Sequence, residues 1–366
     1  MTLKNHNPLF VPLADCHIHA NAMATDEDVE RLANKYSVDL SRHAHIKPGG
    51  KRFWNPEDHS SFHDAYDATV ALMRTPEDLK DVAKHALIRA SAEGCIYAEI
   101  LASGLNNYRV GDPMPVFENN MLALASAIRE AGEETGIVAF ISLTAKRHLK
   151  SGAAGAQQLL DAYEFMKNRH PESAYYITGF NMAGNEEHAN TDIFTDVFDR
   201  AHNRLGLGCA CHAGEVRSAD DIWTALELPG ISRIGHALSA AHDPAVMRAL
   251  KERHILVEQL LTLNETIFPK IYRRPEDHPI RRFHDEGLDI GLGSDDPGMV
   301  GNSIGGEYFK ATEKYGFSPA ALLSFTANSV RYAFAPTAIK TKLLAKLQKF
   351  AADNGILMQP ENFRVP

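Results

Sequence analysis

Eight short apolar runs, separated by amphipathic helical stretches, constrain the fold of this chain more than any other feature. They are Leu13–Ile18, Cys95–Leu101, Ile137–Leu143, Tyr175–Met182, Leu207–Cys211, Ile231–Ile234, Ile255–Leu261 and Leu288–Leu292. Strands that are buried on both faces read as continuous apolar runs, and strands that alternate with helices pair in parallel. Eight such strand–helix units predict an α/β fold closed into a (β/α)₈ TIM barrel rather than an open sheet.

The length of the chain indicates one such domain with additions. A TIM barrel typically takes about 250 residues and can exceed 400 with insertions, and this chain has 366. About 75 residues separate the first apolar run from the second, many more than a simple crossover connection requires. We therefore expect residues 1–366 to form a single hydrolase barrel. Residues 20–90 contain a helical insertion that acts as a lid, and a C-terminal helical extension follows Pro319.

Charge and composition exclude several classes of partner. The formal net charge is −9, and Lys and Arg form no basic patch of the kind that binds nucleic acid. No apolar run approaches the roughly 20 residues that cross a bilayer. The four cysteines lie in apolar, strand-like runs, which is typical of reduced core thiols in a cytoplasmic protein. The sequence leaves the oligomeric state open.

Histidine and carboxylate side chains gather where four of the predicted strands end. These segments are Asp15-Cys16-His17-Ile18-His19, His212-Ala213-Gly214-Glu215, Gly235-His236-Ala237 and Ser294-Asp295-Asp296-Pro297. Residues two apart on a strand point to the same face, so His17 and His19 both aim into the mouth of the barrel. The C-terminal ends of barrel strands form the catalytic face of this fold.

This combination of residues predicts a metal site. Three histidines with one aspartate suit Zn²⁺ or a similar metal, provided that the barrel brings them together and one coordination position stays open for water. Glu215 lies three residues beyond His212 and can act as a general acid or base without ligating. His236 can hydrogen-bond the attacking water. Asp296 either faces away from Asp295 by strand alternation or turns into the pocket.

Each signal also has a structural interpretation. A single H-x-H pair is weak evidence in a chain with 18 histidines, and His43-Ala44-His45 is a second such pair that follows no apolar strand. Asp295-Asp296-Pro297 taken alone could begin a helix. The predicted fourth strand, which runs into Gly179 to Glu186, carries no lysine to bridge two metals, so we expect one ion per chain. Motifs for a serine hydrolase, a phosphate-binding loop and a cytidine-deaminase site are absent.

At these positions the sequence resembles the adenosine deaminase family of the amidohydrolase superfamily. The resemblance extends roughly from Leu13 to Lys346 and includes the four segments above and Gly179 to Glu186. It implies that four residues bind one zinc ion: His17, His19, His212 and Asp295. It also implies that Glu215 protonates purine N1, that His236 orients and deprotonates water, that Asp296 accepts a hydrogen bond from N7, and that the Gly184 backbone meets N3.

The resemblance implies hydrolytic deamination of an adenine-type purine, and the expected reaction is conversion of adenosine to inosine and ammonia. An alternative is deamination of adenine base, of N6-substituted AMP or of another aminated heterocycle. Asn21 motivates it, because nucleoside deaminases usually have the Asp of a Leu-Asp-Gly motif at this position, where it contacts the ribose. A second alternative is an inactive barrel that acts as a binding protein, which loss of a metal ligand or of Glu215 would indicate.

Overall fold

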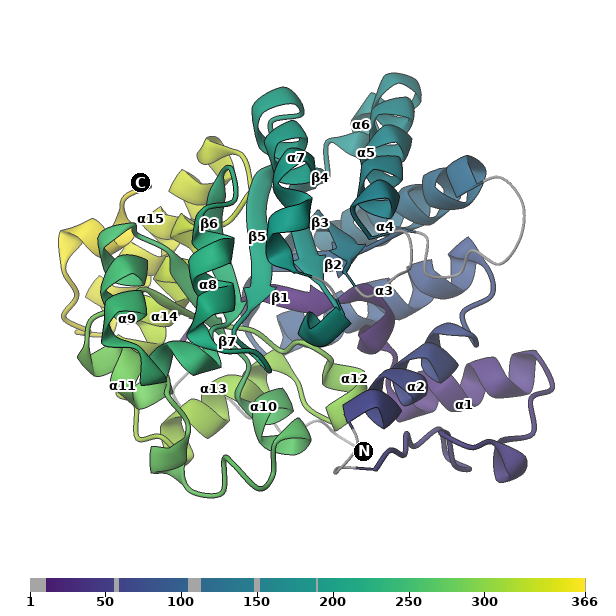
Figure 1. Ribbon diagram of the computed structural model, residues 1–366, viewed down its shortest axis with the longest axis horizontal. Helices are drawn as coiled ribbons and strands as arrows, with labels where there is room; N and C mark the ends of the chain where they lie inside the picture. Colours follow the sequence, from purple (N-terminus) through teal and green to yellow (C-terminus); the bar gives the residue numbers. More distant parts are fainter. Residues whose placement is uncertain (1–10, 56–58, 105–112, 148–151, 189, 366) are drawn as a thin grey trace.

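Eight parallel strands form the centre of the protein (Figure 1). The computed structural model describes residues 11–55, 59–104, 113–147, 152–188 and 190–365. The strands pair in sequence order, and their bounds are β1 Leu13–His19, β2 Cys95–Ala102, β3 Val138–Lys146, β4 Ile177–Ala183, β5 Gly208–Ala213, β6 Ile231–His236, β7 Leu256–Gln259 and β8 Ile290–Leu292. The predicted TIM barrel is confirmed.

Hydrogen bonds between β1 and the segment after β8 close the barrel. The backbone N–H of His19 donates to the carbonyl oxygen of Asp295 at 2.9 Å, and the N–H of Asp295 donates to the carbonyl oxygen of His17 at 2.8 Å. The Ser294 hydroxyl donates to the buried Asp15 carboxylate at 2.5 Å. Closure therefore fixes the backbone on which His17, His19 and Asp295 stand.

Helices surround the strands and follow the predicted alternation. Their bounds are α1 Asp26–Lys35, α2 His59–Val70, α3 Pro76–Ala92, α4 Pro113–Thr135, α5 Gly152–Arg169, α6 Pro171–Ala174, α7 Thr195–Asp199, α8 Ala219–Leu226, α9 Pro244–Glu252, α10 Leu261–Ile267, α11 Ile280–Asp285, α12 Pro297–Val300, α13 Ile304–Glu313, α14 Pro319–Arg331 and α15 Thr337–Asp353. Local chemistry sets several starts. Thr75 and Asp78 form a capping box on α3, and the Asp243 side chain caps α9.

Three predicted strands extended two residues beyond the observed strand at one end, and one of them is Leu288–Leu292, because β8 begins only at Ile290. The run Ile255–Leu261 was expected to be one strand, but β7 ends at Gln259 and the chain enters α10 at Leu261. Tyr175 was expected in the fourth strand, but it follows α6 and is 52% exposed. These errors have one cause, since an apolar residue reads the same whether it lies in a strand or in the helix or turn next to it.

The long segment between β1 and β2 contains α1 and α2 before the barrel helix α3, and Figure 1 shows these two helices at one end of the molecule. The Asp78 carboxylate joins α1 to α3. It accepts hydrogen bonds from Lys35 at 2.6 Å and from the Tyr36 hydroxyl at 2.5 Å. After the barrel, α14 packs against β1 and β8, and α15 packs against α14, as expected for an eighth helix with an extension.

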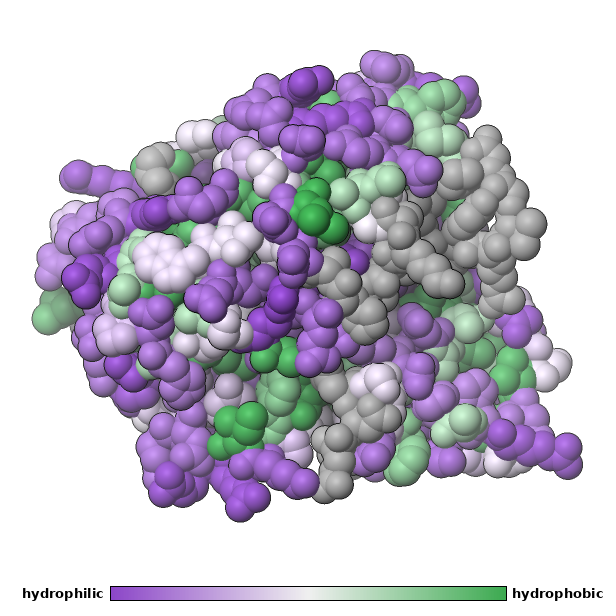
Figure 2. Space-filling model, viewed as in Figure 1, coloured by the Kyte–Doolittle hydropathy of each residue, from purple (hydrophilic) through white to green (hydrophobic). Residues whose placement is uncertain are grey.

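The surface is mainly polar on the face that Figure 2 shows, with apolar residues scattered over it. All four cysteines are buried and unpaired. Within the part of the chain that the structure describes, no helix has the length and apolar character to cross a membrane.

Candidate functional site

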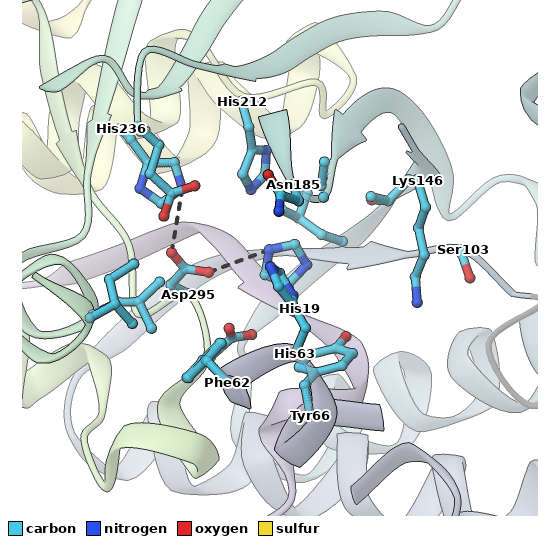
Figure 3. Close-up of a pocket in the computed structure, with 18 of the residues that line it drawn as sticks. His19, Phe62, His63, Tyr66, Ser103, Lys146, Asn185, His212, His236 and Asp295 are labelled. Atoms are coloured by element: carbon cyan, nitrogen blue, oxygen red, sulfur yellow. Dashed lines mark ion pairs between the residues drawn. The ribbon is translucent and has the colours of Figure 1, made fainter. Parts of the chain in front are cut away.

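Four side chains from β1, β5 and the segment after β8 converge at the C-terminal mouth of the barrel, and Figure 3 labels three of them, His19, His212 and Asp295. His17 and His19 belong to β1, His212 belongs to β5, and Asp295 follows β8. The Nε2 atoms of His17 and His212 are 3.1 Å apart, and Asp295 Oδ1 lies 3.3 Å from His19 Nε2 and 3.8 Å from His17 Nε2. The structure thus brings together the four residues that the sequence predicts as ligands.

These distances suit a metal ion. Four ligands at about 2.1 Å from a tetrahedral ion lie about 3.4 Å from one another. The three separations given above, 3.1, 3.3 and 3.8 Å, lie on either side of this value. Burial lowers the pKa of His19 and that of His212 well below the usual value, so both imidazoles are neutral, as ligands must be. Asp295 Oδ2 makes no hydrogen bond with any described residue although it is buried. The cluster is a candidate site for a divalent metal.

A chain of buried charges orients His17. Glu258 Oε2 lies 2.6 Å from His17 Nδ1, and Glu258 Oε1 accepts a hydrogen bond from Arg233 Nε at 2.7 Å. Arg233 also pairs with Glu99 at 2.5 Å and is fully buried. An acceptor at Nδ1 keeps that nitrogen protonated and leaves the Nε2 lone pair for a metal. Sequence reasoning did not identify Glu258, although a carboxylate inside a predicted buried strand was a usable signal.

His236 lies near the second carboxylate oxygen of Asp295, Oδ2, whereas His17 and His19 lie near Oδ1. Its Nε2 lies 3.7 Å from Asp295 Oδ2 and 3.6 Å from Glu215 Oε2. Asn264 lies 3.1 Å from its Nδ1, and Gln259 donates to its carbonyl oxygen at 2.7 Å. The backbone φ angles are +65° at His236 and +58° at Asp295, a region that residues other than glycine rarely adopt. Such strain is typical of functional sites, where surrounding contacts maintain it.

Glu215 lies in the cavity wall beside this cluster. Burial raises the pKa of its carboxyl to about 8, and the nearby carboxylates of Glu186 and Asp296 act in the same direction. Glu186 also holds the loop that carries Glu215, because its carboxylate accepts hydrogen bonds from three consecutive backbone N–H groups, those of residues 215–217, at 2.8–3.1 Å. The carboxyl of Glu215 is therefore equipped to carry a proton at neutral pH.

The remaining predicted site residues fall into two groups. Gly184, which follows β4 with a φ of +95°, and Asp296 both line the cavity. Asp296 also occupies the N-cap position of α12, so this segment does begin a helix, but its side chain makes no capping hydrogen bond. Asn21 does not line this cavity. The chain turns after β1 into the short helix Ala20–Met23, which places Asn21 in a smaller neighbouring cavity and against Tyr66.

His43 and His45 lie in the insertion and line no part of the cavity. Helix α2 of the same insertion contributes three aromatic or imidazole side chains to the wall, those of Phe62, His63 and Tyr66, together with Asp67.

The sequence profile of the adenosine deaminase family matches residues 12–350. The chain belongs to this family. An adenine deaminase of Agrobacterium fabrum is 30% identical over 335 residues, which cover 91% of this chain and 97% of that protein. Among solved structures, an amidohydrolase from Burkholderia ambifaria with bound zinc has a TM-score of 0.81 and 20% identity, with coverage of 97% of this chain and 95% of that one. The N6-methyl-AMP deaminase of Arabidopsis thaliana has a TM-score of 0.77 and 18% identity, with coverage of 95% and 98%.

Membership of the adenosine deaminase family makes this protein a hydrolytic deaminase, so the expected enzyme class is confirmed. The comparisons support purine deamination and favour the alternative substrate, adenine base, over the adenosine that was expected. The described part of the chain retains every residue whose loss would have indicated an inactive barrel.

Proposed function

We propose that this protein removes the 6-amino group of adenine by hydrolysis and releases hypoxanthine and ammonia. The observation that carries the proposal is the convergence of His17, His19, His212 and Asp295, the last three of which line one cavity together with a buried Glu215. The adenine deaminases among the relatives support the free base as the substrate.

We propose zinc as the metal, held by His17, His19, His212 and Asp295, one ion per chain. When bound, such an ion lowers the pKa of a coordinated water to about 7 and so supplies the nucleophile. The zinc-containing structural neighbour and the set of three imidazoles with one carboxylate support this choice.

The residues around the cluster act on the purine. Glu215 donates its proton to N1, because water can add to C6 only if the ring takes up the developing negative charge at the adjacent nitrogen. His236, 3.6 Å from Glu215 and 3.7 Å from Asp295, orients the attacking water and accepts its proton. Asp296 and the backbone of Gly184 hold N7 and N3 at opposite edges of the ring.

The insertion supports a role as a cover over bound substrate. Phe62, His63 and Tyr66 of α2 form a wall of the cavity, so a purine in this cavity is enclosed by the insertion as well as by the barrel. We further propose that the protein acts in the cytoplasm, which its four buried, unpaired thiols support.

Substitution of Glu215 tests the proposal. Glu215→Gln keeps the size of the side chain but removes the proton that it donates, so turnover of adenine should fall by about 10²–10⁴-fold while the metal content stays near that of wild type. Both quantities are measured on one preparation, by ammonia release and by elemental analysis. Normal turnover would exclude Glu215 as the acid, and loss of the metal together with activity would make it a ligand.

A further inference from the structure

Lys146 is a cation inside the cavity for which the chemistry described above has no use. It ends β3 and lines the cavity, with its ammonium 5.6 Å from the centroid of the Tyr66 ring. It forms no hydrogen bond or ion pair with any described residue, although most of its side chain is buried. Burial without a close partner costs free energy and lowers the pKa of the ammonium. A partner from the substrate would offset that cost.

The order of the strands shows which edge of the purine faces Lys146. Gly184 follows β4, and Asp296 follows β8. If these residues hold N3 and N7, the arc of the barrel that runs through β5 faces N1, where Glu215 lies. The other arc runs through β3, β2 and β1, and the part of it that lies away from the metal ligands on β1, at β3 and β2, faces N9. Figure 3 agrees, since Lys146 and Ser103 lie on the side of the cavity away from His236 and Asp295.

The charges in the cavity favour a neutral acceptor at N9 over an anionic substituent. Of the described residues that line the cavity, four carry carboxyl groups and Lys146 alone carries an ammonium or guanidinium group. With Glu215 protonated, one divalent cation and Lys146 together balance the other three carboxylates. The charge of a phosphate attached to the substrate would find no counter-charge among these residues, whereas a lone pair on a ring nitrogen requires none.

We propose that Lys146 donates a hydrogen bond to N9 of free adenine and thereby selects the free base. This inference rests on the proposed function, because it takes the adenine ring to be the substrate. The nitrogen N9 offers a lone pair only in the tautomer that carries its proton on N7. That tautomer also presents an N–H group to Asp296, on the opposite edge of the imidazole ring. In nucleosides and nucleotides N9 bears the sugar and accepts no hydrogen bond, so Lys146 would lose this acceptor.

A two-by-two comparison tests this interaction. Wild type and Lys146→Met are each assayed with adenine and with 9-deazaadenine, which keeps N1, N3 and the N7–H group but has carbon in place of N9. In wild type, replacing N9 should lower kcat/KM. In Lys146→Met the same replacement should have little further effect. The ratio of the two effects should be about 10-fold or more, as for a hydrogen bond to a charged donor. If 9-deazaadenine is not turned over, its inhibition constant is measured in both proteins instead. Lys146→Met should then weaken the use of adenine while leaving the binding of 9-deazaadenine nearly unchanged.

A second variant keeps the test independent of folding. Lys146→Arg retains a cationic donor and should keep a larger share of the discrimination between the two bases than Lys146→Met. A ratio near one in a folded, metal-loaded Lys146→Met protein would overturn the inference while leaving adenine deamination intact. A wild-type preference for AMP over adenine that Lys146→Met abolishes would also overturn it and would make Lys146 a phosphate ligand. Absence of activity on every purine would instead refute the proposed function.

Discussion

Glu258 binds both His17 and Arg233, and Glu258→Gln should weaken both interactions. The carboxylate uses one oxygen to accept from His17 and the other to accept from Arg233. A glutamine offers a single oxygen for these two donors, and its amide group faces one of them with a further N–H. One buried donor therefore loses its acceptor, whichever way the amide turns.

The structure sets the size of the two effects. Breaking a buried ion pair costs about 3–5 kcal/mol of stability, and the lower end applies because Arg233 keeps its 2.5 Å contact with Glu99. Loss of the partner that orients a ligating histidine lowers metal affinity by about 10- to 100-fold, which is about 1.4–2.8 kcal/mol. The variant should fold, unfold at lower temperature than wild type, and bind metal more weakly.

Glu99→Gln is the matched control. Glu99 also pairs with Arg233 and is equally buried, but it does not contact His17. Both variants should lose stability in denaturant titrations of the metal-free protein, and only Glu258→Gln should lose affinity in a titration of zinc against a competing chelator. Equal metal affinity in Glu258→Gln and wild type would refute the idea that this carboxylate prepares His17 for the metal.

Two further changes test other parts of the structure. Asp295→Ala should reduce the metal content from one ion per chain to well below one, measured by elemental analysis, because it removes one of four ligands; full occupancy would contradict the assignment. Asp78→Asn should lower the free energy of unfolding by about 1–3 kcal/mol at pH 7. Burial acts to raise the pKa of the Asp78 carboxyl, but hydrogen bonds from Lys35 and Tyr36 hold this pKa below its usual value. That stabilisation is present above the unfolded pKa of about 3.9 and is lost as the pH falls through the folded value. The difference between wild type and Asp78→Asn should therefore be constant from pH 8 to about pH 5 and shrink below about pH 4, and a constant difference throughout would refute this account.

The barrel could be predicted because its strands are buried on both faces, which makes each of them a continuous apolar run. The same rule located the site, since strand ends meet at one mouth and His17, His19, His212 and Asp295 stand at those ends. The start of α3 was also predictable, because the capping box at Thr75 is a local pattern. Boundaries such as the end of β7 were not, because nothing local separates the last residue of a buried strand from the first residue of a buried helix.

The supporting residues could not be assigned from sequence because their roles depend on distances across the barrel. Glu258 contacts His17 from 241 positions away, and Glu186 binds the loop of Glu215 from about 30 positions away. A glutamate in a sequence shows its charge but not its partner. Asn21 shows the opposite error. It occupies the motif position at which nucleoside deaminases have a ribose-contacting Asp, which suggested a substrate contact, yet the chain turns after β1 and places it outside the main cavity.

The chemistry and the choice of substrate thus depend on different parts of the barrel. In the proposed mechanism, cleavage of the amino group depends on the ends of β1, β5, β6 and β8, which carry the histidines and carboxylates that the sequence motifs describe. In the proposed orientation, the N9 edge of a bound purine faces Ser103 after β2, Lys146 of β3 and Tyr66 of α2, which belong to none of those motifs. Changes on that side can alter which purine is bound without moving a metal ligand. A motif that reliably indicates deamination is therefore uninformative about whether N9 carries a lone pair, a sugar or a sugar phosphate. That distinction depends on the cavity wall around Lys146.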